Sequence, residues 1–392
     1  MKQRYAKLWG RRLAFSLLAT LTVAFLVGCG GDGGPPEQEQ TRCEGGQSSM
    51  EGTAAQGGDT TAASSTEGAN DATAEVIAAT EAFLATLDDA QREQVTFDFD
   101  DPLKCNWSNF PVQMVARNGV TLGDMTEEQQ QAAMAVLEAA LSEEGYQKTV
   151  GNMVSDQVLA AEEGDSEMFG ADLYYFAIFG TPSETEPWML QYGGHHYALN
   201  LTISGEDNVL TPSLTGVQPS EYTLAEAGEL PAFVPADVLG SGTIRPMGDE
   251  NDLAFELINA LDTQQQEQAI LDYDVSALVL GPDQNVRALE PEGIPVSEMN
   301  ADQQTLLLDI VREWAGIVDE RAAEARMSEI EDNLDETYFA WSGPTTNGEP
   351  IYYRMTGPTL HIEFNHEEED VLHIHSIYRD PTNDYSAQSV AE

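Results

Sequence analysis

The sequence predicts an α+β fold built from two copies of one unit, each with helices first and an antiparallel sheet afterwards. An offset of 174 residues carries the Leu-Asp pair at 87–88 onto 261–262, and an offset of 163 carries Tyr-Phe-Ala at 175–177 onto 338–340. A shared helix-forming composition would explain the repeated glutamines, but not the repeated Tyr-Phe-Ala, glycines and prolines. In both halves the apolar spacing then changes from the helical period to strand alternation. We therefore expect an internally duplicated unit.

The helices of each half are predicted from apolar residues that recur on one helical face. The second helix of each half starts with a capping signal, Thr126 with Gln129 in one half and Asn300 with Gln303 in the other. A further helical stretch follows in both halves. The apolar residues that define these helices are Val76, Phe83, Leu84, Leu87, Met134, Leu137 and Leu141, and then Leu253, Leu257, Ile258, Leu261, Leu307, Ile310, Val311 and Trp314.

Strands are predicted after the helices, where apolar and polar residues alternate. Helices followed by strands with short turns favour antiparallel pairing. Residues 219–250, which contain several prolines and glycines, join the two halves. The predicted strand stretches are 172–180, 187–203 and 208–215, and then 335–342, 350–365 and 370–378.

The N-terminus is typical of an export signal, because basic residues precede an apolar run from Leu13 to Val27. This run is shorter than the roughly 20 residues of a stable membrane span. Its end, Leu-Val-Gly-Cys at 26–29, resembles the lipobox of bacterial lipoproteins, which implies cleavage before Cys29 and a lipid anchor on its sulfur. Gly30 follows instead of Asp, so the outer membrane is favoured in a cell that has two membranes. The alternative is an ordinary cleaved signal.

Composition divides the chain into five segments. Residues 30–74 contain almost no large apolar side chain, so they cannot bury enough surface to offset the entropy of ordering. We expect them to form a tether between the membrane and the folded body. The predicted segments are a lipoprotein signal peptide at 1–28, a disordered tether at 29–74, a first repeat at 75–235, a second repeat at 236–385 and a tail at 386–392.

The chain is strongly acidic, with 68 Asp and Glu, 17 Lys and Arg, and a formal net charge of −51. Such a charge repels nucleic acid, which excludes a nucleic-acid partner. Acid excess with few lysines is typical of adaptation to a saline medium. Besides Cys29 the chain has Cys43 and Cys105, which an oxidising compartment would either join as a disulfide or leave unpaired.

Three long motifs lie in the predicted strands. They read Leu-Tyr-Tyr-Phe-Ala-Ile-Phe-Gly-Thr-Pro at 173–182, Gly-Gly-His-His-Tyr-Ala-Leu-Asn at 193–200 and His-Ile-His-Ser-Ile-Tyr-Arg-Asp-Pro at 373–381. Together with Asn-Trp at 106–107 and Ser-Glu-Glu-Gly-Tyr at 142–146, they resemble the DUF3500 family of uncharacterised proteins. The resemblance covers about residues 75 to 385. It supports the fold, but it implies no reaction, because the family has no established activity.

The last two strands predict a patch of polar side chains. Leu-His-Ile-Glu-Phe at 360–364 and Leu-His-Ile-His at 372–375 alternate with period two, so their aliphatic residues face the core. We expect residues 365–371 to form the hairpin loop between these strands. Pairing Ile362 with Ile374 and Phe364 with Leu372 keeps both apolar sets on the same side of the sheet, and we expect this register.

The predicted register places His361 opposite His375 and Glu363 opposite His373. Directly opposed residues have Cβ atoms about 4.5–5.5 Å apart, so three imidazoles and one carboxylate would share one patch. Such a set is suited to zinc or a redox metal. The alternative is that these histidines are solvated or bonded to neighbouring acids. In the first half, offset 163 leaves His196 on the matching face, where it could complete one site across the two halves.

Two functions follow as hypotheses. The first is an exported, lipid-anchored metal-dependent enzyme of the cell envelope, with a divalent metal such as zinc held by the His/Glu cluster. Arg379, Arg354 and His195 are its candidate substrate-binding residues, because cations are scarce in this chain. The second is a non-catalytic envelope protein that binds a ligand or protein partner. No phosphate-binding loop, nucleophile elbow or zincin motif is present to decide between them.

Overall fold

The structure is a computed structural model that describes residues 71–205, 207–282, 284 and 289–387. The predicted signal peptide, the predicted lipidation site Cys29, Cys43 and nearly all of the predicted tether lie outside these residues. Cys105 forms a disulfide. No helix in the described part of the chain is long and apolar enough to cross a membrane.

The helical stretches predicted in each half are present, and each half adds a short helix, at 89–95 and 263–269, that was not predicted. Both capping boxes are present, with Gln129 closing back onto Thr126 and Gln303 onto Asn300. The helices of the first half are α2 (Asp71–Thr86), α3 (Asp89–Val95), α4 (Glu127–Ala140) and α5 (Glu143–Glu163), and those of the second are α6 (Gly248–Ala260), α7 (Thr263–Ala269), α8 (Ala301–Ala315) and α9 (Glu320–Asp332).

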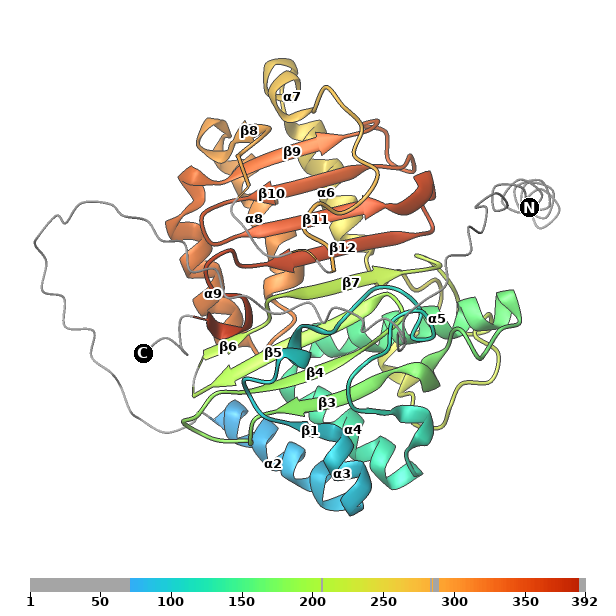
Figure 1. Cartoon of the computed structure of the whole chain (residues 1–392). Helices are drawn as coiled ribbons and strands as arrows, with labels where there is room; N and C mark the ends of the chain where they lie inside the picture. The colour runs from blue at the N-terminus through green and yellow to red at the C-terminus, as the bar shows by residue number, and fades with distance from the viewer. Residues whose placement is uncertain (1–70, 206, 283, 285–288, 388–392) are drawn as a thin grey trace, which may run out of the picture. The chain divides into compact units, whose positions relative to one another are not determined.

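Twelve strands of the described residues form one mostly antiparallel sheet, which confirms the α+β class (Figure 1). The first half supplies β1 (Thr96–Phe97), β2 (Val120–Thr121), β3 (Tyr175–Phe179), β4 (Trp188–Gly194), β5 (Tyr197–Ser204), β6 (Asp207–Val209) and β7 (Ser213–Val217). The second half supplies β8 (Ile294–Pro295), β9 (Tyr338–Ser342), β10 (Tyr352–Thr356), β11 (His361–His366) and β12 (Ile374–Arg379).

The predicted strand stretches 187–203 and 350–365 are each a hairpin rather than one strand. The first turns between Gly194 and Tyr197, which pair across β4 and β5. The second turns between β10 and β11, where Thr356 pairs with His361. Gly-Gly before the first turn and Gly-Pro within the second are turn signals that mark these breaks.

The sheet runs without a break from one half into the other. Its order is β1-β3-β4-β5-β7-β12-β11-β10-β9-β8, so β7 of the first half pairs with β12 of the second. Leu214 and Ile377 lie opposite each other at this junction, and their numbers differ by 163, the offset that aligned the strands in sequence. The ends of β5, β7 and β12 are thereby neighbours, which brings distant histidines together.

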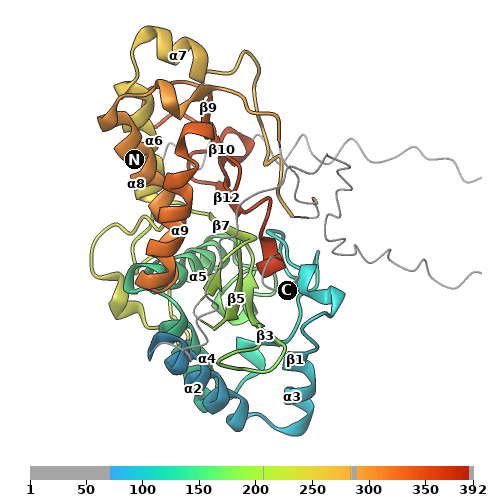
Figure 2. The same ribbon diagram turned by 90° about the vertical axis from the view of Figure 1, so that its left-hand side faces the viewer.

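Six helices, namely α2, α4, α5, α6, α8 and α9, lie on one face of the sheet, and connecting segments cover the other (Figure 2). The helical face holds the main core, where Ile362 and Phe364 point as their alternation predicted. On the opposite face Trp107 and Leu278, from two connecting segments, pack on a small apolar cluster that includes Leu214. Polar side chains of this second face are therefore buried beneath loops and do not face open solvent.

Candidate metal centre

The register of the last hairpin differs from the predicted one. Ile362 lies opposite Tyr378 rather than Ile374, a slip of four residues. The physical reason is the length of the turn, because β12 begins only at Ile374. Leu372, predicted to pair with Phe364 in the core, instead lies in the connection and is 37% exposed.

The slip divides the four predicted ligands into two groups. His361, predicted opposite His375, lies opposite Arg379. Since a strand rises about 3.3 Å per residue, the four residues from His375 to Arg379 correspond to about 13 Å. His361 and Glu363 therefore form one group, while His373 and His375 belong to another at the opposite end of β12.

Three histidines from two segments that are distant in sequence meet at the start of β12. The Nε2 atom of His373 lies 3.0 Å from Nε2 of His196 and 3.1 Å from Nε2 of His375. Ligand atoms of these three residues all lie within 4.8 Å of one another, and no other group of three or more His, Cys, Asp or Glu in the described residues meets this criterion. The sequence indicated His196 as a residue that could complete one site across the two halves. In the structure His196 lies beside two of the four ligands predicted on the last hairpin.

Backbone geometry places these imidazoles. His196 occupies the turn between β4 and β5 with a φ of 61°, a left-handed conformation that histidine adopts more readily than most residues. His375 pairs with Gly216 of the neighbouring strand β7. A Cβ atom on Gly216 would lie 2.7 Å from the carbonyl oxygen of Ile374 and 3.3 Å from Cδ2 of His375. A side chain at Gly216 would therefore displace the strand that carries His375.

Two polar groups contact the outer nitrogen of His375. Its Nδ1 atom lies 3.2 Å from Oε2 of Glu367 and 3.4 Å from Nδ2 of Asn109. The hydrogen bond with His375 lowers the pKa of Glu367, so this carboxylate is ionised at neutral pH. Carboxylates in this position orient a ligating imidazole and raise its basicity.

His195 lies directly beside the cluster. Its ring stacks on His196 with the centroids 3.6 Å apart. Its Nδ1 atom is 2.8 Å from Oδ1 of Asp156 on α5, and the other carboxylate oxygen accepts a hydrogen bond from the Gly170 amide. The predicted substrate-binding residue His195 is therefore held against the three-histidine cluster by a buried carboxylate.

Two histidines of the cluster, His196 and His373, are held in the neutral form. Burial, and then the neighbouring histidines, hold the pKa of His196 well below its ordinary value. Burial and His375 lower the pKa of His373 to about 3. A metal ion binds the unprotonated nitrogen, so at neutral pH these lone pairs are available without loss of a proton.

His361 and Glu363 form a buried pair away from the cluster. Nε2 of His361 lies 2.8 Å from Oε1 of Glu363. The amides of Val279 and Leu280 donate to the two oxygens of Glu363, and the hydroxyl of Tyr352 donates to Oε2. Every partner is an internal group, so the pair fastens a connecting segment onto the sheet.

The two candidate substrate-binding arginines are also engaged internally. Nε of Arg379 donates to Asp384, and Nη1 donates to the carbonyl oxygens of Leu280 and Gln284. Arg354 forms an ion pair with Glu292. Neither guanidinium contacts the three-histidine cluster in these interactions.

Three neighbours of the site were not predicted from the sequence, namely Asn109, Asp156 and Glu367. Glu367 stood in the predicted hairpin loop beside the histidines, and its position after β11 was a usable signal. Asn109 and Asp156 come from a long connection and from a helix. Only the tertiary fold places them here, and we find no sequence signal that would have identified them.

Comparison with known proteins gives one family. The family model described as "Protein of unknown function (DUF3500)" matches residues 69–387. No curated protein matches the chain. No solved structure matches it either.

Proposed function

The chain belongs to the DUF3500 family, whose description assigns no activity, and from the site geometry we propose that His196, His373 and His375 bind a divalent transition metal such as zinc. The observation that carries this proposal is the approach of three Nε2 atoms. Tetrahedral zinc with bonds of about 2.0–2.1 Å holds two ligand nitrogens about 3.3 Å apart. The separations of 3.0 and 3.1 Å need only a small adjustment to reach that value.

Hydrogen bonding alone explains this cluster less well. A neutral imidazole carries one N–H group, so Nε2 of His373 can donate to only one of its two neighbouring Nε2 atoms. A ring nitrogen that donates has no lone pair left to accept, so the second close contact of His373 Nε2 is not a hydrogen bond. A shared metal ion instead accepts all three lone pairs at once.

We propose that the bound metal is catalytic, in a metal-dependent enzyme of the cell envelope. Three histidine ligands leave one coordination position for water or substrate, which is the usual composition of catalytic zinc sites. His373 is the half-buried member of the cluster, so access from solvent is expected on its side. A metal with an open position supplies an activated water and polarises a carbonyl or phosphoryl oxygen, chemistry suited to hydrolysis.

A structural metal is the second candidate. It is favoured by the origin of the ligands, because His196 comes from the first half and His373 and His375 from the second. A metal at this point would join the two halves where β7 meets β12. The two candidates differ in whether a fourth coordination position exchanges with small ligands.

The metal proposal predicts one equivalent of zinc or cobalt(II) per chain, measured by equilibrium dialysis and elemental analysis. His373→Ala should weaken binding about a hundredfold or more, because it removes one of three ligands. His366→Gln is the matched control, since His366 is buried on the same hairpin but bonds to the Ile351 amide. The His366→Gln variant should still bind one equivalent of metal per chain.

Less than a tenth of an equivalent in the wild type, or equal binding by wild type and His373→Ala, would refute the proposal. The visible spectrum of the cobalt(II) protein then separates the two candidates. A catalytic site with an open position should change its spectrum when thiocyanate is added. A closed structural site should not.

We also propose that the chain is exported and anchored by a lipid on Cys29, with the outer membrane favoured in a cell that has two membranes. The charged start, the apolar run and Leu-Val-Gly-Cys support this location. The disulfide at Cys105 supports an oxidising compartment.

The anchor is tested by metabolic labelling with a tagged fatty acid in a bacterial host. The wild type should be labelled and should sediment with membranes. Cys29→Ala should lose the label and should no longer sediment with membranes. Cys43→Ala is the matched control and should keep the label. A labelled Cys29→Ala variant would contradict lipidation at this cysteine.

A further inference from the structure

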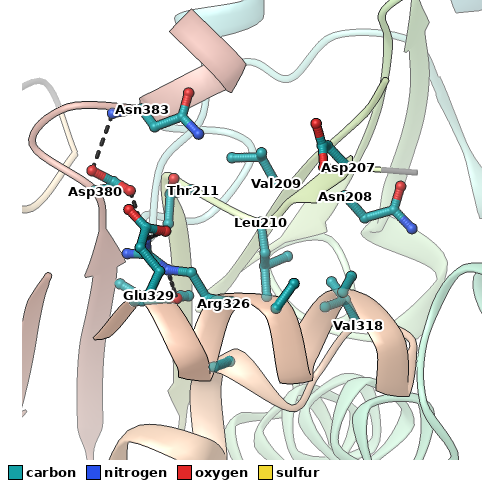
Figure 3. A pocket seen from close by; sticks show the side chains of 14 residues that line it. Asp207, Asn208, Val209, Leu210, Thr211, Val318, Arg326, Glu329, Asp380 and Asn383 are labelled. Atoms are coloured by element: carbon teal, nitrogen blue, oxygen red, sulfur yellow. Dashed lines mark hydrogen bonds and ion pairs between the residues drawn. The ribbon is translucent and has the colours of Figure 1, made fainter. Parts of the chain in front are cut away.

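A cavity of about 270 Å³ lies at the other end of β12 from the three-histidine cluster. It is bounded by residues that follow β5, by α9 and by the segment after β12 (Figure 3). Asp207 and Thr211 come from the first of these, Arg326 and Glu329 from α9, and Asp380 from the last. None of its lining residues belongs to the three-histidine cluster.

The cation of this cavity is not available to an anionic ligand. Among the described lining residues only Arg326 carries a positive charge. Its Nη1 atom lies 2.8 Å from Oδ2 of Asp380 and 2.6 Å from Oε2 of Glu329. Its Nε atom donates to the hydroxyl of Tyr378, and Nη2 donates to the carbonyl oxygen of Thr359. Two carboxylates already outnumber this guanidinium, and Asp207 adds a third.

Two lining residues have buried oxygen atoms without a hydrogen-bond partner. Thr211 is 2% exposed, and its Oγ1 atom has no partner among the described groups. Oδ1 of Asn208 is also buried without a partner, although Nδ2 of the same amide donates to Asp319. An unpaired buried polar atom costs about 1–3 kcal/mol, so a ligand that donates hydrogen bonds would be favoured here.

The remaining wall is apolar. Leu210, Val318 and Ala322 line the cavity together with the ring of Tyr378. Figure 3 shows Val318 below Asn208, and Leu210 between Val318 and Arg326. A ligand that fits therefore combines donor groups with a short aliphatic part.

From these features we propose that the cavity binds a primary ammonium ion with a short aliphatic chain. The ammonium carries three N–H donors and a positive charge, which suit the unpaired oxygens and the excess of carboxylates. A bare metal cation fits less well, because Asp207, Glu329 and Asp380 are not among the described groups with metal-ligand spacing. An anion is opposed by the net charge of the wall. The proposal does not depend on a metal at the histidine cluster.

The probe is n-butylammonium, titrated calorimetrically into the full chain, with n-butanol and butyrate as neutral and anionic analogues of the same length. Saturable one-to-one binding of n-butylammonium is expected, with no saturation by the two analogues. The titration is made at 0.5 M NaCl, because so acidic a chain attracts any cation at low salt. Thr211→Val should weaken binding about five- to tenfold by removing one hydrogen-bond partner.

Thr202→Val is the matched control. Thr202 is as buried as Thr211, and its hydroxyl is also unpaired, but it does not line the cavity. It should bind n-butylammonium as the wild type does. The absence of saturable binding by the wild type, tighter binding of butyrate, or equal affinities of wild type and Thr211→Val would overturn the proposal.

Discussion

Replacing Glu363 by Gln should lower the free energy of unfolding by about 3–5 kcal/mol and leave the metal content unchanged. Glu363 is fully buried, and its two oxygens accept from His361, Tyr352 and the amides of Val279 and Leu280. Glutamine has the same shape, but its NH₂ group would face one of these amide donors. Urea unfolding and elemental analysis of the same samples measure both effects.

The stability that the Glu363→Gln variant loses should depend on pH in a direction that follows from the pKa of Glu363. Burial alone would raise the pKa of Glu363, but hydrogen bonds from His361 and the two amides outweigh burial and lower it below 4.5. A folded-state pKa below the unfolded value contributes stability above about pH 4.5, and this contribution is lost as the pH falls through the folded pKa. The difference between wild type and Glu363→Gln should therefore narrow on acidification.

Glu292→Gln is the matched control for this experiment. Glu292 forms an ion pair with Arg354 on the same face of the sheet, but its side chain is 43% exposed. Its replacement should cost less than about 1 kcal/mol. A Glu363→Gln variant as stable as the wild type would contradict the anchoring role. If the Glu363→Gln variant also lost its metal, Glu363 would instead belong to the metal site, as the sequence predicted.

The error in the hairpin register shows where sequence reasoning stops. Alternation places Ile362 on the core face correctly, because each side chain's face follows from period two. A slip by an even number of residues keeps every side chain on its face, so burial does not distinguish pairing with Ile374 from pairing with Tyr378. Turn length decides between them, and the Glu-rich connection has no specific turn signal.

The sequence predicted more about the position of His196 than about the positions of the other residues around the site. The offset of 163 placed it on the same face as the histidines of the second half. What sequence could not show was the junction of β7 with β12, which makes the turn at His196 a neighbour of His375. Nor could it show that long connections bury the outer face, which changes His361 and Glu363 from exposed candidates into internal anchors.

The two halves also meet through a buried ionic cluster on the helical side. Nζ of Lys148 on α5 lies 2.6 Å from Oε1 of Glu250 on α6 and 3.0 Å from Oε2 of Glu313 on α8. Burial would lower the pKa of Lys148, but the two carboxylates raise it. Burial and the charge of Glu313 raise the pKa of Glu250 to about 7, against the opposing effect of Lys148. The single ammonium group of Lys148 thus compensates the charge of two carboxylates in a region that water reaches poorly.

Lys148→Met should consequently destabilise the protein by about 3–5 kcal/mol at pH 8, because it leaves two carboxylates without a cation. A folded-state pKa above the unfolded value means that ionisation of Glu250 opposes folding, so its contribution to stability falls as pH rises from about 4.5 to about 7. At pH 5 the variant can protonate Glu250, and the loss measured by urea unfolding should be smaller there.

The double variant Lys148→Met with Glu250→Gln tests the cause of that loss. Removing the carboxylate together with the ammonium leaves no unpaired charge at Glu250, so much of the stability at pH 8 should return. Arg312→Met, which breaks the exposed ion pair with Glu324 on the same helical layer, is the matched control and should cost less than about 1 kcal/mol. If Lys148→Met lost equal stability at pH 5 and pH 8, and Glu250→Gln restored none of it, the role of Lys148 would be packing of its aliphatic chain rather than charge compensation between the halves.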